Sequence, residues 1–148
     1  MNKTEMALKR PFKNVKWRKG YKNGKDLVYI DARDVMDRLD TVFGVDGWQT
    51  KYEYMGDRMI CNLSVRFPHE SVTPDYQRDK WVTKSDGADD SSIEGAKGGI
   101  SDALKRAAVL LGIGRYLYNP NSFNANREPA SWATPEGFDQ QMEKRNAS

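Results

Sequence analysis

The stretch GGISDALKRAAVLLGIGRYLY, residues 98–118, continues a helical pattern that begins a few residues earlier. Apolar residues recur there at steps of three and four, which is the spacing of one face of an α-helix. These residues are Ile93, Ala96, Ile100, Ala103, Leu104, Ala107, Ala108 and Leu111. Ser91 and Ser92 precede the run and suit an N-cap. The pattern predicts a helix that buries an alanine-rich face.

Glycines near both ends of this helix need an explanation. Gly98 and Gly99 each weaken a helix by about 1 kcal/mol relative to alanine. Glycines are typically found in spite of this cost where another backbone, of protein or of nucleic acid, approaches closely. The sequence GIGRYL, residues 112–117, is a partial glycine motif that follows a helix and not a strand. It therefore predicts packing at the helix end and not a phosphate-binding loop.

The exposed side of the helix carries basic residues. Lys97, Ser101 and Lys105 share one flank through their spacing of four, and Arg106 lies on the adjacent flank. Such a flank can hold phosphate groups. The alternative is a helix-surface ion pair, because Asp102 and Arg106 are four residues apart and can form a pair that contributes a few tenths of a kcal/mol.

Charge is distributed unevenly along the 148 residues, a length that fits one domain with a tail. Residues 1–30 hold nine lysines and arginines against Glu5 and Asp26, which leaves −4 for the rest of a chain whose net charge is +3. A basic arm on a near-neutral body indicates a polyanionic partner. The alternative is that the lysines serve solubility alone.

Several classes of function are excluded by composition. A single Cys61 and a single His69 leave no disulfide framework, zinc cluster or histidine-based catalytic triad. No lysine has Asp or Glu two residues before it, which a restriction-nuclease-like site requires. No apolar run approaches the roughly 20 residues of a membrane span. We expect a cytoplasmic protein that is not an enzyme, binds no metal or cofactor and has no membrane contact.

The remaining patterns predict an α+β fold, in which an antiparallel meander of three or four strands packs against two main helices. The predicted elements are a short helix at 4–10, a helix capped by Asp31 and ended by Gly44, and strands at 48–55, 58–67 and 76–84. In the strand at 58–67, one face is apolar: Met59, Cys61, Leu63, Val65 and Phe67. We expect residues 85–92 to form a flexible acidic loop and residues 119–148 to form a polar, flexible tail.

Aromatic residues interleave with basic ones in the N-terminal arm. Trp17 and Tyr21 lie among Arg18, Lys19 and Lys22. Proteins that bind single-stranded nucleic acid combine cations for the backbone with aromatic rings for the bases. The alternative for Trp17 and Tyr21 is that they anchor the arm to the core.

Two segments at matching separation resemble the DNA-annealing domain of the Rad52 family, which includes short phage and bacterial recombinases. These are YIDARDVMDRLDTVFGVDGW, residues 29–48, and DALKRAAVLLGIG, residues 102–114, with the three strands between them. The most specific parts are Phe-Gly-x-x-Gly-Trp and Leu-Lys-Arg-Ala, and the similarity covers residues 5–118. It implies a sheet packed on helices, assembled into rings or filaments, with single-stranded DNA in a basic groove across neighbouring subunits.

The resemblance also implies site residues. Lys105 and Arg106 would hold the phosphate backbone, Lys97 matches a further basic position, and Tyr29 matches an aromatic residue of the groove wall. Either Arg18 or Lys19 matches an arginine ahead of that aromatic. The chain departs from the family at Val109, where a further arginine is common, and at four positions that are basic elsewhere: Ser85, Asp86, Asp89 and Asp90. Substitutes for a second, outer DNA site would be Arg58, Arg66, Arg78, Lys80 and Lys84.

The function implied by the resemblance is ATP-independent binding and annealing of single-stranded DNA in homologous recombination and repair. The protein would be a homo-oligomer whose annealing domain spans residues 1–118 and which binds single-stranded and also duplex DNA. A docking segment for a single-strand-binding protein would use Trp132 and Phe138 of the tail. The alternative function is an RNA-binding or adaptor protein with a basic arm and no annealing activity; a metal-dependent nuclease comes third.

Overall fold

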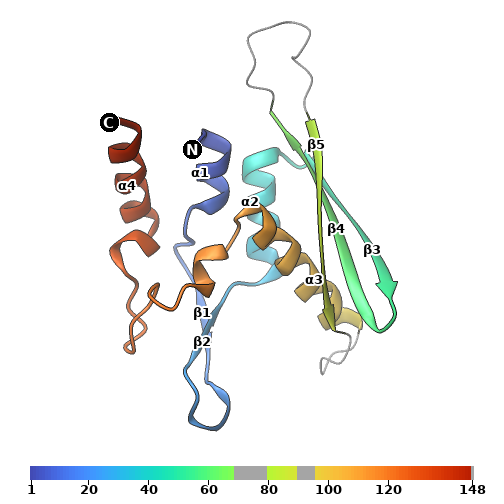
Figure 1. Ribbon diagram of the computed structural model, residues 1–148, viewed down its shortest axis with the longest axis horizontal. Helices are drawn as coiled ribbons and strands as arrows, with labels where there is room; N and C mark the ends of the chain where they lie inside the picture. Colours follow the sequence, from blue (N-terminus) through green and yellow to red (C-terminus); the bar gives the residue numbers. More distant parts are fainter. Residues whose placement is uncertain (69–79, 90–95, 148) are drawn as a thin grey trace, which may run out of the picture. The chain divides into compact units, whose positions relative to one another are not determined.

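The computed structural model describes residues 1–68, 80–89 and 96–147 of the chain (Figure 1). Two compact units make up the fold. Unit 1 combines Met1–Ile30 with Gly112–Ser148, and unit 2 is Asp31–Leu111. The described elements are α-helices, a two-stranded sheet and a three-stranded sheet, so the predicted α+β class is confirmed. No helix in the described ranges is long and apolar enough to cross a membrane.

The sheet of unit 2 is an antiparallel meander in the order β3-β4-β5, as predicted. Its strands are β3 (Trp48–Met55), β4 (Arg58–Phe67) and β5 (Lys80–Asp89). The first two match their predicted bounds. The third was predicted at 76–84, of which 76–79 lie outside the described residues. It continues through 85–89, so the prediction of an acidic loop is wrong for these five residues.

Pairing with β4 explains why a Ser-Asp-Gly-Ala-Asp segment forms a strand in spite of its low strand propensity. The hydroxyl of Ser85 donates to Asn62 Oδ1 at 2.6 Å. A Cβ at position 87 would press on the end of the Ile60 side chain, so Gly87 lets the two strands pair without moving it, and Ala88 is buried. Cross-strand contacts therefore override the local preference for a loop.

Helices α2 (Ala32–Phe43) and α3 (Ala96–Leu111) lie on the same side of this sheet (Figure 1). The core of unit 2 forms between them and the predicted apolar face of β4. Its buried side chains are Val35, Leu39, Phe43, Met59, Cys61, Leu63, Val65, Ala88, Ala103, Leu104, Ala107, Ala108 and Leu111. Helix α2 begins where predicted, with the Asp34 carboxylate accepting the backbone N–H of Asp31, and ends at Gly44. The predicted caps of α3, Ser91 and Ser92, lie outside the described residues.

The Phe-Gly-x-x-Gly-Trp motif joins α2 to β3. Gly44 has a φ of +82°, and a side chain at Gly47 would run into the carbonyl oxygen of Phe43. The Phe43 ring packs edge-on against Phe67, with 5.4 Å between the ring centroids. The indole Nε1 of Trp48 donates to Asp40 Oδ1 at 2.7 Å. Each of the four specified residues of the motif thus has a structural role at this junction.

Unit 1 begins with the predicted short helix, α1 (Lys3–Lys9). An antiparallel hairpin of β1 (Lys16–Arg18) and β2 (Leu27–Tyr29) follows, with the 3-10 turn η1 (Tyr21–Asn23) between the strands. After α3, Gly112 and Gly114 have φ values of +107° and +72°, which confirms that the glycine motif marks the helix end. The other elements are η3 (Arg115–Tyr118), η4 (Ser131–Ala133) and α4 (Pro135–Ala147).

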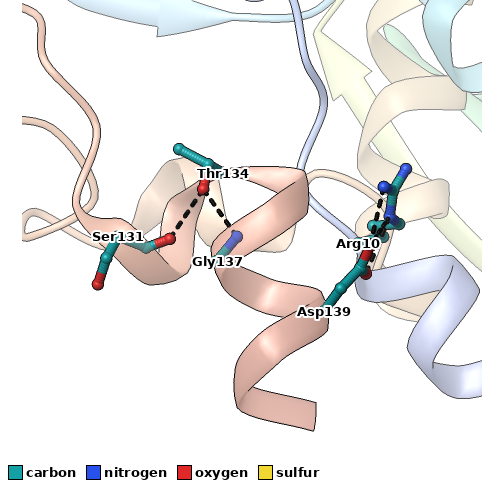
Figure 2. Close-up of polar contacts among 5 residues, drawn as sticks. All are labelled: Arg10, Ser131, Thr134, Gly137 and Asp139. Atoms are coloured by element: carbon teal, nitrogen blue, oxygen red, sulfur yellow. Dashed lines mark hydrogen bonds and ion pairs between the residues drawn. The ribbon is translucent and has the colours of Figure 1, made fainter. Parts of the chain in front are cut away.

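Residues 119–147 differ from the expected polar tail, because they contain η4 and α4 and form part of unit 1. Figure 2 shows how α4 begins: Thr134 Oγ1 accepts the backbone N–H of Gly137 at 3.0 Å and donates to the Ser131 carbonyl at 2.9 Å. On the same helix, the Asp139 carboxylate accepts Nε and Nη2 of Arg10, both at 3.0 Å. A helix cap and a forked ion pair therefore stabilise a polar segment that buries Met142.

Candidate nucleic-acid interface

Helix α3 presents Lys105 and Arg106 side by side, each in a loose ion pair. Lys105 Nζ lies 3.7 Å from Asp102 Oδ1, and Arg106 Nε lies 3.6 Å from Asp86 Oδ1 on β5. The predicted partner of Asp102 was Arg106, whereas the structure pairs it with Lys105. The side chain of Arg106 is 53% exposed and that of Lys105 is 29% exposed. Exposed ion pairs contribute about 0–1 kcal/mol, so phosphate oxygens can replace either carboxylate at little cost.

The first turn of α3 holds Lys97, Gly98 and Gly99. Gly99 is buried and Gly98 is half-buried. This burial arises within one chain, so Gly99 is covered by the protein itself. Contact of Gly98 with a DNA backbone or a neighbouring subunit stays a prediction.

The β1–β2 hairpin places two predicted site residues on one face. Lys16 pairs with Tyr29 and Arg18 pairs with Leu27, and directly paired residues of an antiparallel ladder share a face. Lys16 and Arg18 are exposed, Tyr29 is half-buried and Leu27 is 48% exposed. We call these four residues the hairpin face. Lys16 and Leu27 were missed at the sequence level, where strands of three residues leave too short an alternation to identify a face.

The opposite face of the hairpin packs against the C-terminal part of unit 1. The Trp17 ring meets Phe123 edge-on, with 5.1 Å between centroids, and the Arg127 guanidinium lies over Trp17. The hydrogen bond from Arg127 and its positive charge lower the pKa of Asp26. Trp17 is therefore an anchor, as the alternative interpretation held. Tyr21 is 85% exposed, so it does not anchor the arm.

The basic residues suggested for a second DNA site lie on both faces of the unit 2 sheet. Arg58 and Arg66 belong to the outer face, which α2 and α3 leave uncovered, whereas Lys80 and Lys84 pair with Phe67 and Leu63 on the helix-covered face. Arg78 lies outside the described residues. Arg66 lies over the Trp81 ring at 5.9 Å and 3.5 Å from Asp46 Oδ1, and Arg58 Nη2 donates to the Gly87 carbonyl. The four described residues therefore do not form one surface.

Side chains that could ligate a metal do not cluster in the described part of the chain. It contains no group of three or more histidine, cysteine, aspartate or glutamate side chains placed to hold a metal ion. Cys61 is fully buried, and this burial raises the pKa of its thiol, as expected for a core thiol. Burial also raises the pKa of the neighbouring Tyr52 to about 12. Neither group is poised to react at neutral pH.

The predicted site residues thus form two surfaces, one in each unit. Arg18, Lys19 and Tyr29 belong to the hairpin of unit 1, where Lys19 directly follows β1 and is exposed. Lys105 and Arg106 lie on α3 of unit 2, and Lys97 lies in its first turn. Exposed cations such as Arg18, Lys19 and Arg106 suit a nucleic-acid backbone, and a ring such as Tyr29 suits stacking on bases.

Comparison with known proteins agrees with this chemistry. Residues 1–131 match the model of the Rad52/22 family double-strand break repair proteins. The single-stranded DNA-binding protein DdrA of Deinococcus deserti is 35% identical over 121 residues, which cover 74% of this chain and 56% of that protein. DdrA of Deinococcus radiodurans is 36% identical over 93 residues, 63% of this chain and 40% of that protein. This chain spans about half the length of these curated relatives. It belongs to the Rad52/22 family, as the sequence motifs predicted.

Proposed function

We propose that this chain binds single-stranded DNA and anneals complementary strands, without nucleotide hydrolysis, in recombination and double-strand break repair. The observation that carries the proposal is the adjacent pair Lys105 and Arg106 on α3, whose side chains reach the solvent. The chain that carries this pair belongs to a family of double-strand break repair proteins. Relatives that cover much of the chain are single-stranded DNA-binding proteins by name.

Phosphate binding is the chemistry that α3 supports best. Lys105 and Arg106 each face a carboxylate at 3.6–3.7 Å, a separation typical of a weak surface pair. Two oxygens of one phosphate can accept forked, charge-assisted hydrogen bonds from the Arg106 guanidinium, whereas Asp86 Oδ1 lies 3.6 Å from Arg106 Nε, beyond hydrogen-bond distance. DNA binding would therefore exchange two weak internal contacts for stronger external ones.

The hairpin face adds groups for both parts of a nucleotide. Lys16 and Arg18 are exposed cations for phosphates, while Leu27 and Tyr29 beside them are apolar and aromatic surfaces for a base. Stacking of a base on an aromatic ring contributes about 1–3 kcal/mol and does not depend on base identity. Such a surface binds single strands of any sequence.

Annealing follows from binding that leaves the base edges free. Cations that neutralise phosphates also reduce the repulsion between two DNA strands. Two coated strands then approach until complementary bases pair, and base pairing alone supplies the specificity. This process needs no catalytic residue, cofactor or metal ion, so we propose a binding protein and not an enzyme, acting on DNA in the cytoplasm.

A homo-oligomer would extend the short surfaces of one chain. A few cations on α3 and on the hairpin bind only a few nucleotides, whereas a row of subunits can hold a long strand. We propose assembly into a ring or filament, with duplex DNA as a further ligand. Binding of a single-strand-binding protein through Trp132 and Phe138 would use half-buried side chains of η4 and α4 and not an extended tail. Light scattering in the presence and absence of DNA measures the assembly.

The test is the annealing of two complementary dye-labelled oligonucleotides without nucleotide or magnesium. We compare the wild-type protein with the double variant Lys105→Ala/Arg106→Ala. The matched control is Lys51→Ala, which removes an exposed cation from the outer face of β3. Thermal unfolding of each variant checks the fold.

Fast annealing by the wild type and the control, and its loss in the double variant, would support the proposal. A folded wild-type protein that binds the oligonucleotides without accelerating annealing would favour the RNA-binding or adaptor function. Equal annealing by all three proteins would contradict the role given to α3.

A further inference from the structure

Strand β5 and helix α3 bring together cations that are far apart in the sequence. Lys80, Lys84 and Asp86 lie on the helix-covered face of the sheet, since they pair with Phe67, Leu63 and Cys61. Arg106 reaches this face from α3 and forms its ion pair with Asp86. Residues two apart on a strand are separated by roughly 7 Å, so Lys84 lies close to the contact between Asp86 and Arg106.

We propose that Lys80, Lys84 and Arg106 form one track that binds the phosphates of single-stranded DNA, and that the Asp86 carboxylate competes with phosphate for Arg106. This inference rests on the proposed function and extends the binding surface from α3 to β5. It also assigns Lys80 and Lys84 to the same surface as Arg106 and not to a separate outer site.

The two lysines are available for a ligand. Both side chains are exposed, and within residues 1–68, 80–89 and 96–147 neither forms an ion pair with a carboxylate. Lys80 and Lys84 are separated by roughly 13 Å along the strand. They therefore contact separate parts of an extended backbone.

The outer face of the same sheet offers a contrast, because its polar groups already bind one another. Ser64 and Thr83 share a hydrogen bond of 2.8 Å, and Asn62 Nδ2 donates to Glu53 at 3.0 Å. Arg58 Nε lies 3.6 Å from Asp89. Polyanion binding on that face would have to break this network, whereas the β5–α3 face leaves its lysines open.

Asp86 is placed to compete with DNA. Its Oδ1 accepts the backbone N–H of Gly87 at 2.7 Å, which fixes the carboxylate, and the same oxygen lies 3.6 Å from Arg106 Nε. The side chain of Asp86 is 32% exposed. A phosphate that approaches Arg106 thus has to displace the Asp86 carboxylate, which the hydrogen bond to Gly87 fixes in place, and is repelled by its negative charge.

The first experiment measures the affinity for fluorescein-labelled oligodeoxythymidine by anisotropy over a series of NaCl concentrations. Lys84→Ala is expected to weaken binding and to lower the log–log salt slope by about 0.7, the value for one phosphate contact on a single strand. Lys80→Ala is expected to act in the same way. Lys51→Ala on the outer face is the control and leaves the slope unchanged.

The second experiment tests the competition by Asp86. Asp86→Asn keeps an oxygen for the Gly87 N–H and removes the charge, and it is expected to tighten binding by up to about fivefold. This gain is expected to disappear in the Arg106→Gln background. The matched control is Asp89→Asn, which removes a carboxylate from the outer face of the same strand and is expected to tighten binding less.

The outcomes separate this inference from the proposed function. No binding by the folded wild-type protein would overturn both. Binding by the wild type with an unchanged salt slope in Lys84→Ala and Lys80→Ala would overturn the track alone. Equal tightening in Asp86→Asn and Asp89→Asn, or a gain that persists without Arg106, would overturn the competition.

Discussion

The guanidinium carbon of Arg127 lies 5.2 Å from the ring centroid of Trp17. Its Nε and Nη2 also donate to Asp26 Oδ2, at 3.0 and 2.7 Å. One residue of the C-terminal part of the chain thus contacts β1 and the residue that precedes β2. It lies beyond position 118, where the DNA-binding domain was expected to end. The hairpin therefore packs against a segment that the sequence predicted to be a flexible tail.

Arg127→Ala is expected to lower the free energy of unfolding and to weaken single-stranded DNA binding. An exposed cation–π contact contributes about 0.5–1 kcal/mol, and its loss also leaves the hairpin less well fixed. Urea denaturation and anisotropy measure the two effects. Lys144→Ala, which removes an exposed cation from α4, serves as the control. An effect of Arg127→Ala no larger than that of the control would contradict this role.

Acid is expected to weaken the contact between Arg127 and Asp26. Because the hydrogen bond and charge of Arg127 lower the pKa of Asp26 in the folded protein, its carboxylate stabilises the fold above the ordinary pKa near 3.9. This contribution is lost as the pH falls below that value and through the depressed folded-state pKa. Urea denaturation at several pH values, compared with Asp26→Asn, checks the result. An identical acid dependence in the variant would show that Asp26 does not contribute.

Lys16→Ala and Arg18→Ala are each expected to weaken single-stranded DNA binding and to lower the salt slope by about 0.7. Tyr29→Ala is expected to weaken binding without changing the slope, because stacking involves no counterion release. Lys3→Ala on α1 removes a cation elsewhere in unit 1 and is the control. A slope change in Tyr29→Ala equal to that of the lysine and arginine variants would argue against stacking.

Gly47→Ala is expected to destabilise the fold more than Gly56→Ala. A side chain at position 47 would run into the Phe43 carbonyl oxygen, so the junction between α2 and β3 has to shift. At Gly56, which has a φ of +67° and open space around it, alanine meets only backbone strain of about 1–2 kcal/mol. Thermal unfolding compares the two. A smaller loss of stability in Gly47→Ala than in Gly56→Ala would mean that the junction between α2 and β3 adapts to the added side chain.

Cys61 is expected to resist thiol reagents in the folded protein. It is fully buried, so a reagent does not reach the sulfur. Burial also raises the pKa of its thiol, so the reactive thiolate does not form at neutral pH. Labelling with an aromatic disulfide reagent is expected to be slow without urea and fast above the unfolding midpoint. Rapid labelling of the native protein would mean that β4 opens locally.

Much of the fold could be predicted because its signals are local. The stripes of α2 and α3 follow the helical period, and β4 alternates strictly, so these elements could be predicted from spacing, with Asp31 and Gly44 marking the ends of α2. The glycines at 44, 112 and 114 mark chain reversals through positive φ values. The segments used for family recognition are parts of these same elements.

The rest depended on contacts between distant residues. Residues 85–89 have the composition of a loop, but their pairing with β4 makes them a strand. Residues 119–147 have the composition of a flexible tail, but Thr134 caps a helix there and Arg10 forms a forked ion pair with Asp139. Composition gives the average structural preference of a segment and does not identify the residues that it contacts. Neither the strand at 85–89 nor the helix within 119–147 could therefore be predicted from it.

The same division holds for the binding surfaces. By itself, the sequence determined which residues are candidates for DNA binding: the Lys105–Arg106 pair, the basic arm and Tyr29. Only the tertiary structure decided which cations share a face. Strand register places Lys84 on the helix-covered side of the sheet, where Arg106 of α3 pairs with Asp86, and places Arg58 and Arg66 on the other side. A shift of one residue in register would exchange the faces, and the energy that sets the register comes from burial of the β4 core side chains against α3.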